Sequence, residues 1–391
     1  MERIGIFGGT FNPPHLGHLR AAQYARNTLE LEKLLVIPTC IAPHKQLRPD
    51  MPTPQQRLEL ARLCFSGEKM EVSDLELRRG GTSYTYETVE QVKALYPGRE
   101  LVLFVGTDMF LTMLNWKEPR RIFHSASVAV FARGDRGEQA AILEQKAELE
   151  KLGTKVYVLD NPVTAISSTD LRRMLRFECA AEFLEPQVLE YINRTGLYGV
   201  QENCKGLPES DLEQVVVSLL KENRVAHVLG CRDTAVKLAQ HWGANPVDAA
   251  RGGLLHDITK ALDGPLQLTL CHTYGTMLDD FSRQNPKTLH ALTGSLVAER
   301  IFGENDAVVA AIRSHTTGKA NMNLLEKIIY VADYMEPNRN FQGVEQLREL
   351  AYSDIDGALR MGLEMTVDML REQGREISGE SLEALAWLKR Q

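Results

Sequence analysis

Two histidines three residues apart, His15 and His18, lie near the start of the chain, after an apolar run that ends in Gly8 and Gly9. Glycines at the end of a strand let the backbone approach a phosphate closely, and the amides at a helix N-terminus attract anions. Both imidazoles share one face of a predicted helix, so they can donate to phosphate oxygens as charge develops during phosphoryl transfer. The alternative is a pair of surface histidines beside a turn.

Histidines and aspartates in the second half of the chain form a second candidate group. His256 and Asp257 are adjacent within an apolar segment that predicts a helix. A buried His–Asp pair is costly unless it is compensated, either by a metal ion or by hydrogen bonds in a core. Separate apolar helical stretches supply four more candidates: His227, His290, His315 and Asp333. Four histidines with two aspartates offer the nitrogen and oxygen ligands that suit first-row transition metals.

The elements that must position His15 and His18 alternate between strand-like and helix-like segments. Strands are predicted at residues 3–9, 33–39, 70–77, 100–108, 127–134 and 155–160, and helices at 16–30, 55–65, 84–97 and 137–153. This alternation is typical of an α/β doubly wound parallel sheet, a Rossmann-like fold. The ligand crevice of such a sheet lies at the carboxyl ends of its strands.

The second half of the chain loses this alternation. Residues 200–208 are polar and contain glycine and proline, which is typical of a linker. Residues 209–391 show helical periods throughout and no strand-like alternation, which predicts an all-α domain. A chain of 391 residues is also long for a single core, so we expect two domains, 1–199 and 209–391.

Charge and composition exclude several function classes. Residues 1–200 carry 25 basic and 25 acidic side chains, so the whole net charge of −7 lies in the second half. An acidic second half argues against a nucleic-acid partner. No apolar run reaches the length of a membrane span, so no membrane partner is expected. Six cysteines without CxxC spacing predict reduced thiols and a cytoplasmic location. A homo-oligomer remains open.

Seven segments of the first half resemble the bacterial nicotinate-nucleotide adenylyltransferase family, within the HxGH nucleotidyltransferase superfamily. They are GIFGGTFNPPHLGHL, VIPTCIAPHK, SYTYETVEQV, FVGTDMFLTMLNWKEPRRIF, Arg133-Gly134, ISSTDLRRML and YINRTGLYG, in family order over residues 1–199. The resemblance implies adenylyl transfer from ATP, with Mg²⁺, to nicotinate mononucleotide, which yields nicotinate adenine dinucleotide and pyrophosphate. The attacking phosphate is already an anion, so the site has to position reactants and stabilise charge. Another phosphorylated acceptor, such as phosphopantetheine, is the alternative.

The same resemblance implies the site residues. On the ATP side these are Gly8, Gly9, Thr10, Phe11, His15, His18, Lys45, Asp108, Ile166, Ser167, Ser168, Thr169 and Arg172. Among them it implies catalytic roles for His15, His18, Lys45 and Arg172. The nicotinate nucleotide is expected to meet Ser83, Tyr84, Thr85, Trp116 and Arg133. Taken alone, Trp116 would be a core residue, Ser167 and Ser168 a helix cap, and Lys45 a solvated lysine.

The second half resembles the HD-superfamily phosphohydrolases, in particular a bacterial family that cleaves diadenosine tetraphosphate symmetrically to two ADP. GLLHDITK, HTTG and LEKIIYVADYMEPNR carry this resemblance over most of residues 208–391. It implies that Asp257 bridges two divalent metals, iron or else manganese. His227, His256 and Asp333 would hold one metal, and His290 and His315 the other. Lys260, and more weakly Arg339, would neutralise a phosphate. The alternatives are a non-catalytic nucleotide-sensing or regulatory module and a hydrolase of another nucleotide.

Overall fold

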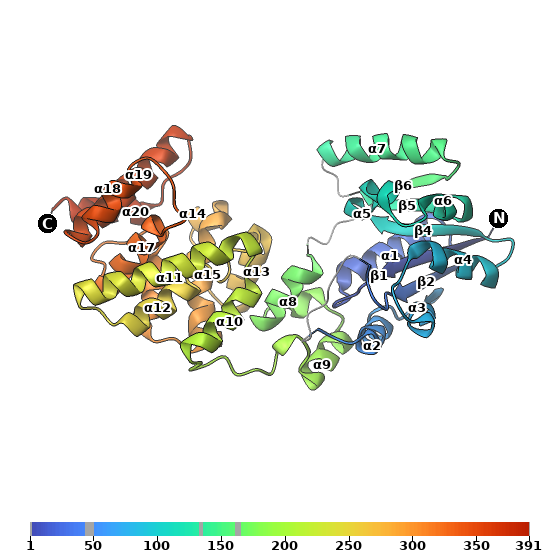
Figure 1. Ribbon diagram of the computed structural model, residues 1–391, viewed down its shortest axis with the longest axis horizontal. Helices are drawn as coiled ribbons and strands as arrows, with labels where there is room; N and C mark the ends of the chain where they lie inside the picture. The colour runs from blue at the N-terminus through green and yellow to red at the C-terminus, as the bar shows by residue number, and fades with distance from the viewer. Residues whose placement is uncertain (1, 44–50, 133–135, 161–165, 391) are drawn as a thin grey trace. The chain divides into compact units, whose positions relative to one another are not determined.

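Six parallel strands form one sheet in the first half of the chain, in the order β3-β2-β1-β4-β5-β6 (Figure 1). The strands are β1 (Arg3–Gly9), β2 (Lys33–Pro38), β3 (Met70–Val72), β4 (Glu100–Gly106), β5 (Ser127–Ala132) and β6 (Val156–Asp160). The order of the strands changes direction between β1 and β4, which are neighbours in the sheet. Such a switch point leaves a crevice at the carboxyl ends of the two strands. The predicted doubly wound parallel sheet is therefore confirmed.

This computed structural model describes residues 2–43, 51–132, 136–160 and 166–390. The chain divides into two compact units, Met1–Glu202 and Asn203–Gln391, which we call the sheet unit and the helical unit. No helix in the described ranges is both long enough and apolar enough to cross a membrane.

Helices cover the sheet, which explains why its central strands are almost continuously apolar. The sheet unit contains α1 (Leu16–Thr28), α2 (Pro54–Cys64), α3 (Leu75–Arg79), α4 (Thr85–Leu95), α5 (Thr107–Leu111), η1 (Met113–Asn115), α6 (Pro119–Ser125), α7 (Arg136–Lys151), α8 (Ser168–Arg176), η2 (Ala181–Phe183), α9 (Pro186–Thr195) and η3 (Leu197–Gly199). Packing is close at Gly5 in β1, where a Cβ atom would lie 2.6 Å from Leu34 and 2.8 Å from Phe104. The strand that leads to the histidines therefore needs glycine at this position.

One predicted strand is wrong over most of its length. Of residues 70–77, only Met70–Val72 form a strand, and the chain then turns into the short helix α3. An ion pair between Arg78 and Asp74, one helical turn apart, supports this helix. Glu76 is buried and accepts a hydrogen bond of 2.6 Å from the hydroxyl of Thr88. The alternation of apolar and polar residues predicted a strand here because it treated Glu76 as exposed. In the structure Glu76 is buried and pairs with Thr88.

The helical unit contains no strand among its described residues, so the predicted all-α class is confirmed. Its elements are α10 (Glu209–Leu219), α11 (Glu222–Trp242), α12 (Pro246–Leu255), α13 (Gly264–Thr273), α14 (Asp280–Gln284), η4 (Pro286–Thr288), α15 (Leu289–Val297), η5 (Ala298–Phe302), α16 (Asp306–Ser314), α17 (Leu324–Met335), α18 (Val344–Leu350), α19 (Ile355–Glu372) and α20 (Gly379–Leu388).

Glycine lets α11 and α12 approach each other closely. A Cβ atom at Gly253 would lie 2.6 Å from the Cα atom of Arg232, which is backbone and cannot give way. This close approach matters for the site, because α11 carries His227 and His256 directly follows α12. A larger side chain at position 253 would push the two histidines apart.

Candidate functional sites

The loop between β1 and α1 brings His15 and His18 together at the carboxyl edge of the sheet. His15 occupies the position just before α1, and its ring centroid lies 3.7 Å from that of His18. The Nδ1 atoms of both rings are buried and have no hydrogen-bond partner among the described residues. Burial lowers the pKa of His15 to about 4, and burial together with His15 lowers the pKa of His18. Two neutral imidazoles thus offer unpaired nitrogens to a ligand.

Phe11 and the two glycines shape this loop. Phe11 has a φ of +47° and packs edge-on against His18, with ring centroids 5.3 Å apart. A Cβ atom at Gly9 would lie 3.0 Å from the Phe11 ring, whereas one at Gly8 would meet nothing within 4 Å. Gly8 therefore faces open space, where a nucleotide can approach the strand end.

The start of α8 is fastened to the same loop. The hydroxyl of Ser168 donates to the carbonyl oxygen of Pro13 at 3.1 Å, and Arg172 donates to that of Asn12 at 2.7 Å. Ser167 caps the helix by accepting from the amide of Asp170. Ile166 and Thr169 lie at the same helix start. The structure thus places the segment 166–172 beside the histidine loop, as a second helix N-terminus that can bind phosphate.

Two side chains that hold this loop were missed by sequence reasoning. Arg57 is completely buried and donates to the carbonyl oxygens of Thr10 at 2.8 Å and Cys40 at 2.9 Å. The hydroxyl of Tyr198 donates to the side-chain oxygen of Asn12 at 2.8 Å. These contacts join residues that are far apart in the chain, so no local pattern could have predicted them.

Of the residues expected around the nicotinate nucleotide, Ser83, Tyr84 and Thr85 lie at the start of α4, and Trp116 directly follows η1. The hydroxyl of Ser83 accepts from the amide of Cys40 at 3.0 Å, and Thr85 begins α4. Lys117 lies over the ring of Tyr84, 3.9 Å from its centroid. Trp116 is half-buried and packs against the core of the sheet unit, so it contributes to that core.

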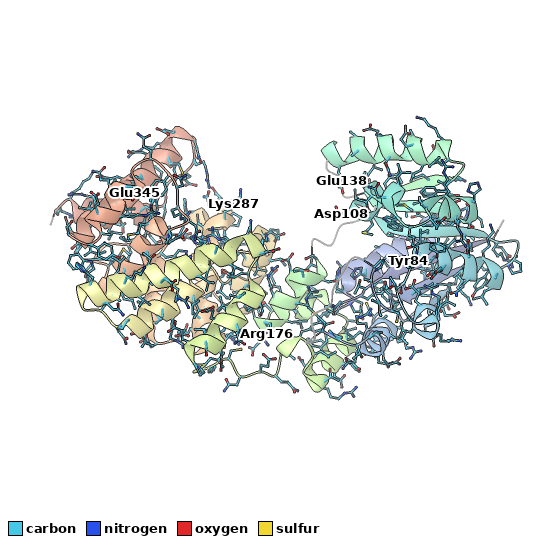
Figure 2. The ribbon with its side chains drawn as sticks, in the orientation of Figure 1. Tyr84, Asp108, Glu138, Arg176, Lys287 and Glu345 are labelled. Carbon is cyan, nitrogen blue, oxygen red and sulfur yellow. The ribbon has the colours of Figure 1, made fainter. Side chains whose placement is uncertain are left out.

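Three of the site residues predicted in the sheet unit remain: Asp108, Lys45 and Arg133. Asp108 is exposed in the first turn of α5, directly after β4, at the carboxyl edge of the sheet (Figure 2). Lys45 and Arg133 lie outside the described residues. The described ATP-side residues therefore gather at β1, α1, α8 and the end of β4.

In the helical unit, six predicted residues converge from five segments. They form two groups that could each hold a metal ion: His227, His256 and Asp333, and Asp257, His290 and His315. We call these six residues the HD cluster. In the first group, Nε2 of His227 lies 3.2 Å from Nε2 of His256 and 3.1 Å from Oδ1 of Asp333.

Asp257 lies between the two groups. Its Oδ2 atom is 3.7 Å from Nε2 of His227 and 3.6 Å from Nε2 of His256. Its Oδ1 atom is 3.5 Å from Nε2 of His290 and 3.8 Å from Nε2 of His315. One carboxylate oxygen thus faces each group, which is the arrangement of a bridging ligand.

Hydrogen bonds fix the orientation of all four imidazoles. The Nδ1 atoms of His256, His290 and His315 donate to backbone carbonyl oxygens at 2.7, 2.9 and 2.6 Å. Nδ1 of His227 donates to the carboxylate of Glu336 at 3.1 Å. A proton on Nδ1 leaves a lone pair on Nε2, so four lone pairs point at the two groups. Metal-ligating histidines have this arrangement.

The charge states of the HD cluster agree with a cation site. Burial lowers the pKa of His256 to about 4 and of His290 to about 3, so both rings are neutral near pH 7. Burial alone would raise the pKa of Asp257, but the surrounding histidines and Lys260 hold it well below its usual range. Neutral acceptors and carboxylates that converge within 4 Å repel one another unless a cation lies between them. The donor set therefore fits two divalent metal ions.

Three cationic side chains surround the HD cluster. Arg224 pairs with Oδ2 of Asp257, and Arg339 donates to Oδ1 of Asp333 at 2.6 Å. Nζ of Lys260 lies 2.9 Å from Nε2 of His290. Sequence reasoning missed Arg224, although it precedes His227 by three residues and so shares its helix face. Positive groups thus lie directly beside the carboxylates of the cluster.

The helix expected to contain His256 and Asp257 is shorter than predicted. α12 ends at Leu255, and the following amides of Ile258 and Lys260 donate to carbonyl oxygens three residues back rather than four. The backbone therefore turns more tightly here, and the side chains of His256 and Asp257 lie in the cluster. The pair therefore lies just beyond the helix end.

Glu336, like Arg224, contacts the HD cluster and was not revealed by the sequence. It is 1% exposed, accepts from His227, and also accepts from the backbone and side-chain amides of Asn338 at 2.7 and 2.9 Å. A Cβ atom at Gly230 would lie 2.5 Å from its Oε2 atom, so glycine makes room for it. Glu336 thus holds the ring of His227 in the orientation that a metal ligand needs.

Replacing Glu336 with glutamine is expected to weaken metal binding by about 10–100-fold, as loss of an outer partner of a metal-bound histidine does. A glutamine amide can still fill the space, but it removes the charge that favours the Nδ1 proton of His227. Metal titration of the chelator-treated protein measures the effect. Glu345→Gln, on the exposed face of α18, is the matched control. Equal affinity in the Glu336→Gln variant and wild type would contradict the role assigned to Glu336.

Comparisons with known proteins agree with this division. Residues 6–174 match the family model described as cytidylyltransferase-like, and residues 224–338 match that of the HD domain. A Dictyoglomus thermophilum protein named "Probable nicotinate-nucleotide adenylyltransferase" is 36% identical over 198 residues, 50% of this chain and 99% of that protein. One of the same name from Desulfitobacterium hafniense is 36% identical over 201 residues, 51% of this chain and 97% of that protein.

Among solved structures, a predicted HD superfamily hydrolase involved in NAD metabolism from Clostridium acetobutylicum is 37% identical to this chain. The match covers 47% of this chain and 99% of that one, with a TM-score of 0.46.

Proposed function

Because the first half of this chain belongs to the nicotinate-nucleotide adenylyltransferase family and its second half carries an HD domain, we propose that it is a bifunctional enzyme. The sheet unit transfers adenylyl from ATP to nicotinate mononucleotide. The helical unit hydrolyses diadenosine tetraphosphate to two ADP. The observation that carries the second assignment is the HD cluster, in which Asp257 directs one oxygen at each of two groups of ligand atoms.

Adenylyl transfer forms one bond and breaks another at the α-phosphorus of ATP. An oxygen of the 5′-phosphate of nicotinate mononucleotide attacks, and the bond to the β-phosphate oxygen breaks, so pyrophosphate leaves. The unpaired nitrogens of His15 and His18 and the helix start at Ser167–Arg172 lie where they can hold the ATP phosphates. Gly8 leaves the space for the nucleotide to approach. These groups position the reactants and stabilise developing charge, and no side chain has to remove a proton.

Asp108 is the described residue that suits Mg²⁺ at this edge of the sheet. It is an exposed carboxylate at the end of β4, and Mg²⁺ in nucleotide sites needs one or two carboxylates because phosphates and waters complete its shell. When bound, Mg²⁺ supplies positive charge to the phosphates. Lys45 is proposed to supply further charge, and Ser83, Tyr84, Thr85, Trp116 and Arg133 to bind the nicotinate nucleotide.

In the helical unit, the residues of the HD cluster would hold two divalent cations, and iron is the proposed metal. When bound, these ions activate water and neutralise phosphate charge. The chain itself orients the ligands through the Nδ1 bonds of its histidines. Lys260, Arg224 and Arg339 border the cluster and can pair with phosphate oxygens of the substrate.

Product analysis with the purified full chain tests both assignments. With ATP, we expect nicotinate adenine dinucleotide from nicotinate mononucleotide and no product from phosphopantetheine. With diadenosine tetraphosphate and protein reloaded with iron or manganese after chelation, anion-exchange chromatography should show ADP alone. Formation of ATP and AMP would refute symmetrical cleavage. Full metal loading with no hydrolysis of any nucleotide would instead indicate a nucleotide-sensing module.

A further inference from the structure

A cavity of about 560 Å³ borders the HD cluster on the side of its second group. Its lining includes His290, a member of the cluster, together with Lys260 and Thr316. The hydroxyl of Thr316 lies 3.2 Å from Nε2 of His290 and 3.2 Å from Nε2 of His315. A phosphate group held at the cluster would therefore lie at the mouth of this cavity.

The charges along the cavity are nearly balanced. Its ionic lining residues are Lys260, Lys287, Arg375, Asp263 and Glu376. Both carboxylates already accept hydrogen bonds, Asp263 from a backbone amide at the start of α13 and Glu376 from the side chain of Asn285 at 3.0 Å. Lys287 lies beside α14, at the edge of the helical unit (Figure 2). A surplus of one positive charge suits a short phosphate chain attached to an uncharged nucleoside, rather than phosphates along the whole cavity.

Apolar side chains line another part of the cavity: Leu262, Phe281, Pro286, Met369 and Leu370. Phe281 is half-buried, and Met369 is 44% exposed although it is apolar. An aromatic face with neighbouring apolar groups binds the flat face of a nucleobase by stacking. The volume also lies within the range of about 300–1,000 Å³ that is typical of sites for small molecules and cofactors.

A smaller cavity of about 350 Å³ shares Phe281 with the larger one. Its lining includes Met277, Leu278 and Arg313 but no described residue of the HD cluster. A ligand whose phosphate lies at the cluster therefore reaches Phe281 through the larger cavity.

We propose that the 560 Å³ cavity binds one nucleoside diphosphate half of a dinucleoside polyphosphate. Its phosphates lie at Lys260, His290 and Thr316, and its base stacks on Phe281 and Met369. Since recognition is by stacking, the site accepts either purine. This inference rests on the proposed hydrolase function for its substrate, but the cavity can be tested for nucleotide binding without any hydrolysis.

Photolabelling of the metal-loaded full chain with 8-azido-ADP locates the base. Phe281 and Met369 fall in the tryptic peptides 261–283 and 361–371, and both are expected to carry label. Label in neither peptide would overturn the proposal. Label in 261–283 without 361–371 would place the base in the smaller cavity and would also overturn it. Labelling does not depend on activity. A protein that is labelled in both peptides but does not hydrolyse diadenosine tetraphosphate would contradict the proposed function and would still support the binding site.

Steady-state kinetics gives a second test. Phe281→Ala and Met369→Ala are each expected to raise the KM for diadenosine tetraphosphate, by about tenfold for Phe281→Ala, with kcat within about twofold. Phe281→Tyr should restore the KM. Met277→Ala is the matched control, because Met277 is 94% exposed and does not line the larger cavity. Metal content and circular dichroism verify that each variant is folded. An unchanged KM in Phe281→Ala, or an effect of Met277→Ala as large as that of Met369→Ala, would refute the assignment.

Discussion

Replacing Asp257 with asparagine is expected to reduce hydrolysis of diadenosine tetraphosphate by about a thousandfold or more and to lower the bound metal from two equivalents to one or none. Asp257 directs Oδ2 at His227 and His256 and Oδ1 at His290 and His315. An asparagine offers one oxygen and one amide nitrogen, so it cannot serve both groups. Metal analysis of the purified protein and a time course of ADP release measure the two effects.

Asp248→Asn is the control for this variant. Asp248 is half-buried in the first turn of α12, where it accepts from the side chain of Asn305 at 2.9 Å, and it is not part of the HD cluster. Adenylyl transfer by the sheet unit should be the same in both variants as in wild type. Hydrolysis that survives in Asp257→Asn at the wild-type rate would show that the bridging arrangement is wrong.

Replacing His18 with alanine is expected to reduce formation of nicotinate adenine dinucleotide by about 100–1,000-fold in kcat, the usual cost of removing one donor that stabilises transition-state charge. The buried Nδ1 atom of His18 has no partner among the described residues, so its loss removes a group available to the phosphates. The stability cost should be small, because His18 is only half-buried as a residue and its ring packs mainly against Phe11 and His15. Initial rates with saturating ATP and nicotinate mononucleotide test this expectation.

His124→Ala serves as the matched control, because His124 is exposed at the end of α6, outside the predicted site, and its ring bonds the carbonyl oxygen of Arg120. Hydrolysis of diadenosine tetraphosphate should persist in the His18→Ala variant. A His18→Ala protein that transfers adenylyl at the wild-type rate would contradict the role of His18. Loss of both activities together would indicate coupled sites or misfolding.

Much of the fold could be predicted because its determinants are local. Buried strands such as β1 and β4 are continuous apolar runs, and helices such as α1 and α17 carry their apolar residues at helical spacing. The exception is α3. It follows a strand of only three residues, which is too short to show a period, and the buried residue of α3 is the polar Glu76 rather than an apolar one. Local patterns therefore predicted the class of each unit, but not every element boundary.

The candidate ligands could also be predicted, because only a few residue types bind phosphate or metal. His15 with His18, and His256 with Asp257, are conspicuous by type and spacing alone. By contrast, Arg57 and Glu336 are residue types that occur anywhere on a surface. Their roles arise only when the chain brings them to Thr10 and to His227, respectively.

The residue types and their periodicity in the chain were enough to establish a parallel-sheet unit, a helical unit and one set of chemical groups in each. Packing of distant segments decided the rest. It placed α8 against the histidine loop through Ser168 and Arg172, and it directed the two oxygens of Asp257 at different groups of histidines. The physical reason is that these hydrogen bonds and close approaches join groups from separate segments, whose geometry depends on how helices and strands pack rather than on any local preference of the chain.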